Sequence, residues 1–206
     1  MNNTRLGATQ YPTARNVSVR YDEAEDRVQL FAATPRHGRR VALITRRFLA
    51  EFFPKASEAL RRNHPSATET TPVTDVVMQF EHMAAVSGRQ NGPPRGPADV
   101  IRSEIHQGVA SAQARRLIAE ADRNVVERRF LVVSTAIRSE PDWITIALSG
   151  ELRDPLGANG VVPEPVVALV MTREQTHRVL RLLLEQGRKA GWEVEDSLHW
   201  MRMSNV

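Results

Sequence analysis

The sequence contains no cysteine among its 206 residues. Disulfide bonds, thiolate zinc sites, iron–sulfur clusters and a cysteine nucleophile are therefore excluded. A chain without cysteine fits a reducing compartment, and we expect a cytoplasmic protein.

Long hydrophobic runs and aromatic residues are also scarce. The longest apolar run covers residues 166–171, far fewer than the roughly 20 residues that a membrane-spanning helix needs. No charged segment followed by an apolar one opens the chain, so we expect neither a signal peptide nor a membrane partner. Aromatic residues make up 5% of the chain, which argues against a base-stacking surface of the RNA-recognition type.

The remaining composition is that of a folded protein. Hydrophobic residues make up 41% and charged residues 25%, close to the averages of globular domains. The first strands are expected where Val17, Val19 and Tyr21 alternate with polar residues, and then over residues 28–33 and 41–44. From Thr45 the period becomes helical. The apolar face of this expected helix consists of Phe48, Leu49, Phe52, Phe53, Ala56 and Leu60.

A similar order of elements occurs near the other end of the chain. Residues 131–137, 143–148 and 166–171 have the patterns of three further strands. Thr172 and Gln175 then have the spacing of a capping box, which predicts the start of a helix. Its apolar face would hold Val179, Leu180, Leu183 and Leu184.

The predicted fold class is therefore α+β, with two similar strand–strand–strand–helix units and a helical insertion between them. The two units suggest a pseudo-twofold duplication, and chance similarity is the alternative. The expected organisation is a flexible N-terminal arm (1–16), a first unit (17–63), a helical insertion (64–124) containing a Gly/Pro-rich linker (87–97), a second unit (125–191) and an apolar tail (192–206).

Two helices are expected in the insertion. Thr71 and Pro72 form a good helix start, and residues at helical spacing follow them. These residues are Val73, Val76, Val77, Phe80 and Met83. A more polar helix is expected over residues 98–123.

Motif searches point to no catalytic residue, no cofactor site and no metal site. The chain has no phosphate-binding loop, no dinucleotide-binding glycine pattern and no serine-hydrolase elbow. No two histidines lie four residues apart, as a zinc-binding helix would require. We expect the histidines at the surface or at its rim: His37, His64, His82, His106, His177 and His199. An enzyme with a dispersed acid/base site is kept as one alternative function.

Arginine supplies nearly all the positive charge. Lysine occurs only at Lys55 and Lys189 among 28 basic residues, and the formal net charge is +4. Such a bias can reflect the nucleotide composition of the source genome as well as phosphate binding, and acids are interleaved with the arginines. Nucleic-acid association is a second alternative. Its candidate residues are Arg39, Arg40, Arg46, Arg47, Arg115 and Arg116.

The last residues of the chain are rich in side chains that favour protein interfaces. Tryptophan anchors contacts rigidly and methionine adapts to irregular surfaces. The candidate contact residues are Trp192, Leu198, Trp200, Met201 and Met203. This tail either packs on the core of its own chain or anchors a partner.

These observations favour a non-enzymatic accessory or assembly protein that acts through protein–protein contacts. The expected partner is another protein or a second copy of the chain in a homodimer.

Overall fold

The computed structural model describes residues 3–62, 64, 71–87, 127–153 and 162–193. Among these residues it shows a mixed α+β fold with eight strands in two sheets and three helices. The strands are β1 (Asn3–Leu6), β2 (Thr9–Pro12), β3 (Asn16–Asp22), β4 (Arg27–Thr34), β5 (Gly38–Ile44), β6 (Glu127–Ser139), β7 (Trp143–Leu152) and β8 (Glu164–Thr172). The helices are α1 (Arg46–Arg62), α2 (Thr71–Ser87) and α5 (Arg173–Lys189).

The larger sheet contains six strands in the order of the sequence, from β3 to β8. All neighbouring strands in it are antiparallel except β5 and β6, which are parallel. Parallel neighbours need a long crossover connection, and the chain between β5 and β6 includes α1 and α2. The predicted strands of both halves are therefore present, and they lie in one continuous sheet.

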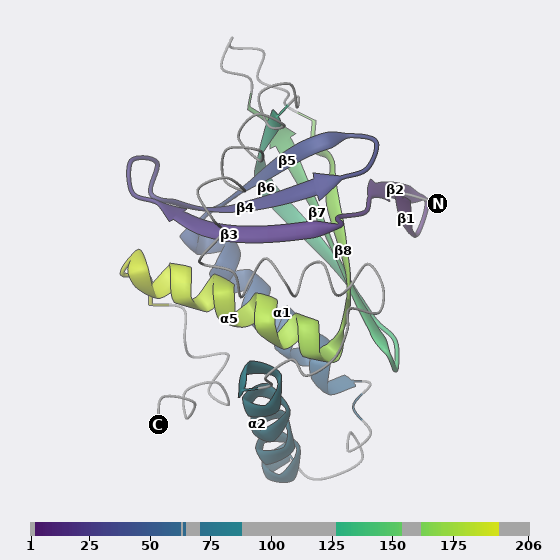
Figure 1. Ribbon diagram of the computed structural model, residues 1–206, viewed down its shortest axis with the longest axis vertical. Coiled ribbons are helices and arrows are strands. Elements are labelled where there is room, and N and C mark those ends of the chain that lie inside the picture. Colours follow the sequence, from purple (N-terminus) through teal and green to yellow (C-terminus); the bar gives the residue numbers. More distant parts are fainter. Residues whose placement is uncertain (1–2, 63, 65–70, 88–126, 154–161, 194–206) are drawn as a thin grey trace, which may run out of the picture.

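Helices α1 and α5 lie along the same side of this sheet, and α2 lies beyond them, farther from the strands (Figure 1). The apolar face predicted for α1 is buried as expected, with Leu49, Phe53 and Leu60 fully inaccessible. Pro54 lies on the exposed side of α1, and the helix continues past it to Arg62. The main core is thus the layer between the sheet and these two helices.

Helix α5 begins where the sequence predicts. The side chain of Thr172 accepts a hydrogen bond from the backbone of Gln175, and the side chain of Gln175 accepts one from the backbone of Thr172. Gly191, just after the helix, has a φ of 67°, a left-handed conformation that glycine adopts without a steric penalty. The apolar residues of α5 pack into the main core.

The structure differs from the prediction at the N-terminus. Residues expected to form a flexible arm instead form the β1–β2 hairpin, and Tyr11 of β2 is buried against Ala147 and Ala168 of the large sheet. The Tyr11 hydroxyl also hydrogen-bonds to Ser149 at 2.9 Å. The buried ring of Tyr11 and the backbone hydrogen bond from Ala14 to Ala168 together dock this segment, and this burial offsets the cost of ordering its backbone.

The order of elements agrees with the predicted units, since β3–β5 precede α1 and β6–β8 precede α5. This order alone does not confirm that the halves are copies of each other, and the duplication stays a prediction. The helix expected over residues 98–123 lies outside the described residues.

Candidate interaction face on helix α2

Within the described residues, α2 is the one helix that packs mainly against another helix and not against the sheet. The residues on its inner side, which faces α5, recur at helical spacing. The buried residues on this side are Thr74, Met78, His82 and Ala85. Met78 belongs to the main core, so α2 is an integral part of the fold.

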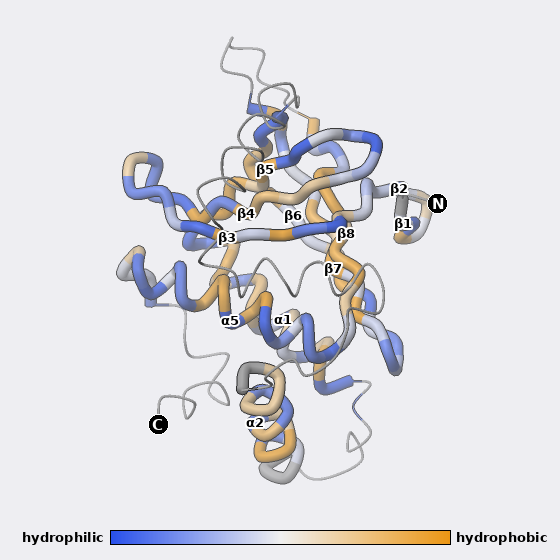
Figure 2. The backbone as a smooth tube through the Cα atoms, viewed as in Figure 1, coloured by the Kyte–Doolittle hydropathy of each residue, from blue (hydrophilic) through white to orange (hydrophobic). Residues whose placement is uncertain are grey.

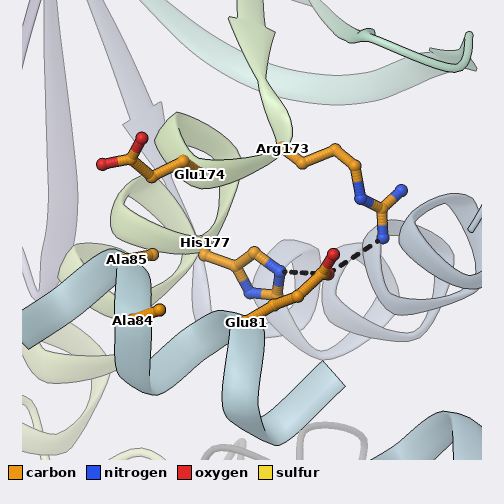
Figure 3. A pocket seen from close by; sticks show the side chains of 6 residues that line it. All are labelled: Glu81, Ala84, Ala85, Arg173, Glu174 and His177. Atoms are coloured by element: carbon orange, nitrogen blue, oxygen red, sulfur yellow. Dashed lines mark hydrogen bonds and ion pairs between the residues drawn. The ribbon is translucent and has the colours of Figure 1, made fainter. Parts of the chain in front are cut away.

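Glu81, on the inner side of α2, joins three segments that are distant in sequence. One carboxylate oxygen, Oε1, lies 3.1 Å from Nε2 of His64, between α1 and α2. The other, Oε2, lies 3.4 Å from Nε2 of His177 and accepts a hydrogen bond from Nη2 of Arg173 at 3.2 Å. Figure 3 shows the latter two contacts, which connect α2 to α5. The carboxylate therefore ties α2 to its supporting helices.

The charge state of Glu81 follows from these contacts. Burial raises the pKa of Glu81, but the hydrogen bond from His177 and the charge and hydrogen bond of Arg173 outweigh it and lower the pKa to about 2. The carboxylate is thus ionised at neutral pH. A carboxylate with so low a pKa is a weak base, so its geometry suits a fixed counter-ion better than a proton acceptor in catalysis.

His82 lies beside this cluster and behaves as a core residue. Its ring centroid is 5.6 Å from that of His177. Burial, together with the neighbouring His177 and Arg181, lowers the pKa of His82 to about 4. His82 is therefore neutral at pH 7.

Two further arginines fix the ends of α2. Arg61 of α1 forms an ion pair with Asp75 in the first half of α2. Arg178 of α5 donates a hydrogen bond of 2.6 Å to the carbonyl oxygen of Ala85 near the other end, where helix carbonyls lack partners within the helix. With Glu81 between them, these contacts hold α2 in one orientation.

A pocket of about 460 Å³ opens between α2 and α5. The residues that line it are Glu81, Ala84, Ala85, Arg173, Glu174 and His177 (Figure 3). Of the two glutamates, Glu174 pairs with Arg178 and Glu81 with Arg173. Within the described ranges, no group of three acidic or histidine residues is arranged to hold a metal ion.

The outer side of α2 carries the most exposed hydrophobic residues of any helix in the described part of the chain. Val76 is 50% exposed, Phe80 66% and Met83 40%, and their spacing places them in one row. Figure 2 shows hydrophobic colour along much of α2. We call Val76, Phe80 and Met83 the outer stripe. The prediction that apolar residues recur at helical spacing is confirmed, but these three face solvent.

Comparison with known proteins identifies no relative. No protein-family model, no curated protein and no solved structure matches the chain. No helix in the described residues is long and apolar enough to cross a membrane. The site must therefore be interpreted from its own chemistry.

The predicted contact residue Trp192 lies on the core of its own chain. Its ring packs edge-on against Tyr21, with centroids 6.1 Å apart, and its Nε1 donates a hydrogen bond of 3.2 Å to Asp26. Trp192 is buried and is therefore unavailable as an anchor for a partner. The other predicted contact residues of the tail, Leu198, Trp200, Met201 and Met203, lie outside the described residues.

The four predicted nucleic-acid residues that the structure describes are not gathered in one place. Arg40 is buried and donates hydrogen bonds to the carbonyl oxygens of Pro165 and Val166, and burial lowers its pKa. Arg39 pairs with Glu127. Arg46 and Arg47 are exposed beyond the opposite end of β5, and Arg47 pairs with Glu51. Arg115 and Arg116 lie outside the described residues.

The histidine prediction is wrong for three of the six residues. His64, His82 and His177 are buried instead of lying at the surface. Sequence spacing could not reveal the cluster, because its members come from three separate segments. The available signal was the presence of Glu81 and His82 in a helix rich in apolar residues, since such polar residues need partners when buried. His37 is exposed, as predicted, and His106 and His199 lie outside the described residues.

Proposed function

We propose that this protein is a non-enzymatic accessory or assembly protein, and that the outer stripe of α2 is its protein-contact surface. The observation that carries the proposal is the exposure of Val76, Phe80 and Met83 side by side on a well-anchored helix. Single exposed hydrophobic residues are common on soluble proteins, whereas a contiguous row marks an interaction site.

The chemistry of α2 supports this proposal. A helix that is apolar on both sides is normally buried on both sides. The only acidic residues in α2 are Asp75 and Glu81, and both pair inward with arginines. The outer stripe therefore has no charged neighbour on α2 that would favour its hydration.

The anchoring of α2 also favours binding. A contact surface loses affinity when its side chains and backbone must first become ordered. The contacts of Glu81 with three residues and of Arg178 with the end of the helix hold α2 in place before any partner arrives. The outer stripe is therefore preorganised.

The test measures the size of the protein's assembly in a gently prepared, low-salt extract of cells that express it. We expect the wild-type chain to elute well above its monomer mass of 23.1 kDa. Phe80→Glu should return it to the monomer position, because a charge in the centre of an apolar contact is costly to bury. Val162→Glu is the matched control, since Val162 is 79% exposed and lies outside α2. Elution of the wild type as a monomer at every concentration tested, or identical elution of the two variants, would contradict the proposal.

Nucleic-acid association remains a second proposal, supported by the exposed Arg46 and Arg47 at the start of α1. Binding to DNA or RNA that is strong at low salt and falls steeply with added salt would support it. Charge reversal at both arginines should then reduce binding, while Phe80→Glu should leave it unchanged.

An enzyme with a dispersed acid/base site is the third proposal, supported by the pocket beside Glu81 and His177. His177 is buried, and both carboxylate oxygens of Glu81 already contact hydrogen-bond donors. Glu174, the more exposed carboxylate of the pocket, would therefore have to exchange protons with a substrate. Loss of an identified activity on Glu174→Gln would support this proposal.

We also propose that the two strand–strand–strand–helix units are copies of each other, with the protein located in the cytoplasm. The parallel pairing of β5 with β6 supports duplication, because it orients β3–β5 and β6–β8 alike within the sheet. In that alignment Arg173 corresponds to Arg46 and His177 to Ala50, so the arginine is present in both units and the histidine only in the second.

A further inference from the structure

We propose that the partner covering the outer stripe is a second copy of this chain, with the two α2 helices packed antiparallel about a twofold axis near Phe80. This inference rests on the proposed function and names the occupant of that surface. It follows from the charge of the surface, the spacing of its residues and its extent.

The charge of the outer stripe suits self-association. Two copies of a charged surface repel each other, whereas two copies of an uncharged one do not. Val76, Phe80 and Met83 carry no charge, and the flanking residues Gln79 and Ala84 carry none either. An acidic or basic partner would find no opposite charge here, so an equally apolar and uncharged surface is the best complement.

The spacing of the outer stripe fits an antiparallel pair. Val76 lies four residues before Phe80 and Met83 three residues after it, so the row is nearly symmetrical about Phe80. In an antiparallel pair of helices, Phe80 would lie opposite the partner's Phe80, and Val76 opposite the partner's Met83. Each copy then presents the same patch to the other, as a twofold interface requires.

The extent of the surface indicates a reversible dimer. A helix of 17 residues is about 25 Å long, and the stripe occupies only part of it. A helix face about 10 Å wide and of this length covers on the order of 250 Å², less than the roughly 800 Å² that each partner contributes to a standard stable interface. We therefore expect a dimer that forms at micromolar or higher concentrations and separates on dilution.

The absence of cysteine allows a direct test by disulfide cross-linking of the purified full-length chain, because each introduced thiol is the only one present. Phe80→Cys alone should form cross-linked dimers at least tenfold faster than Val162→Cys, the exposed control. A mixture of Val76→Cys and Met83→Cys chains should cross-link faster than either chain alone. The mixture keeps Phe80, so it reports on the interface even where Phe80→Cys weakens it.

Light scattering during size-exclusion chromatography gives a second measurement on the unmodified chain. We expect its mass to rise from 23.1 kDa towards twice that value with increasing concentration, and Phe80→Glu to remain a monomer. A wild-type monomer at all concentrations, with Phe80→Cys no faster than Val162→Cys, would overturn the inference. Cross-linking of Val76→Cys with itself as fast as in the mixture would indicate parallel helices and would overturn the antiparallel arrangement.

The two proposals fail in different ways. If the purified chain is monomeric but the cell extract contains a larger assembly that Phe80→Glu dissociates, the partner is another protein and only the self-association is refuted. If Phe80→Glu also leaves the assembly in the extract unchanged, the proposed function of α2 is refuted as well.

Discussion

The contacts of Glu81 give the most direct test of how α2 is held in place. In Glu81→Gln the shape of the side chain is retained and its charge is removed. Arg173 then loses the only acidic side chain that contacts it within the described residues, and its Nε and Nη1 are already buried without a hydrogen-bond partner. A partly buried guanidinium without a counter-ion is costly, so the variant should be less stable.

The pKa of Glu81 sets the size of the effect. Its fall from 4.5 to about 2 corresponds to about 3 kcal/mol, at ~1.4 kcal/mol for each pH unit. A third of the side chain is exposed, and solvent screens the charges there. We therefore expect Glu81→Gln to lower the free energy of unfolding at pH 7 by about 2 kcal/mol.

The effect should also depend on pH in a defined direction. Because the pKa is lower in the folded state, the unfolded chain takes up a proton first as the pH falls below 4.5. The stability contributed by Glu81 is therefore complete at neutral pH and is lost as the pH falls from 4.5 towards 2. The difference between wild type and Glu81→Gln should be constant above about pH 5.5 and shrink below it.

Urea unfolding followed by tryptophan fluorescence measures this difference, since the buried Trp192 becomes exposed on unfolding. Glu174→Gln is the matched control: it removes a carboxylate from the same pocket, but a more exposed one, and should cost less than about 0.5 kcal/mol. Equal stability of the two variants at pH 7, or a difference that persists undiminished to pH 3, would refute the reasoning.

Three further predictions follow from the packing. In urea unfolding of the monomer, Met78→Ala should destabilise the protein by about 2–5 kcal/mol and Phe80→Ala by less than about 1 kcal/mol. The reason is that Met78 is buried and Phe80 is exposed. The reverse order of the two effects would mean that α2 faces the other way. His82 has a pKa of about 4, so its ring should remain neutral down to about pH 5 in an NMR titration. Because the unfolded chain takes up the proton below pH 6.5, the free energy of unfolding should fall as the pH is lowered from 6.5 to 4. Titration of His82 near pH 6.5 would contradict its burial. Gly150→Ala would place a Cβ 2.5 Å from the carbonyl oxygen of Leu131, so we expect a clear drop in thermal stability, and an unchanged melting temperature would show that the strands separate without cost.

The strands and helices of the two halves were predictable because their signals are local. Val17 and Val19 alternate with polar residues, and the strand there needs no distant contact to be recognised. The capping box of Thr172 and Gln175 closes within four residues. The N-terminal hairpin was missed because Tyr11, which docks it, finds its pocket on β7 and β8, more than 130 residues away.

The candidate site was less predictable than the fold. The histidine cluster depends on contacts between residues 64, 81 and 177, and no spacing rule relates them. Likewise, Arg40 is a strand residue whose side chain could face solvent or the core, and only the position of β8 decides that it is buried.

The sequence by itself determined that α2 is a helix, since Thr71 and Pro72 start it and apolar residues recur along it. It did not determine which side of α2 is buried, because Val76 and Phe80 on one side are as apolar as Met78 and Ala85 on the other. The tertiary structure decided this through Glu81. A carboxylate that accepts hydrogen bonds from Arg173 and buried histidines must face them, so α2 turns its charged side inward and leaves the outer stripe exposed.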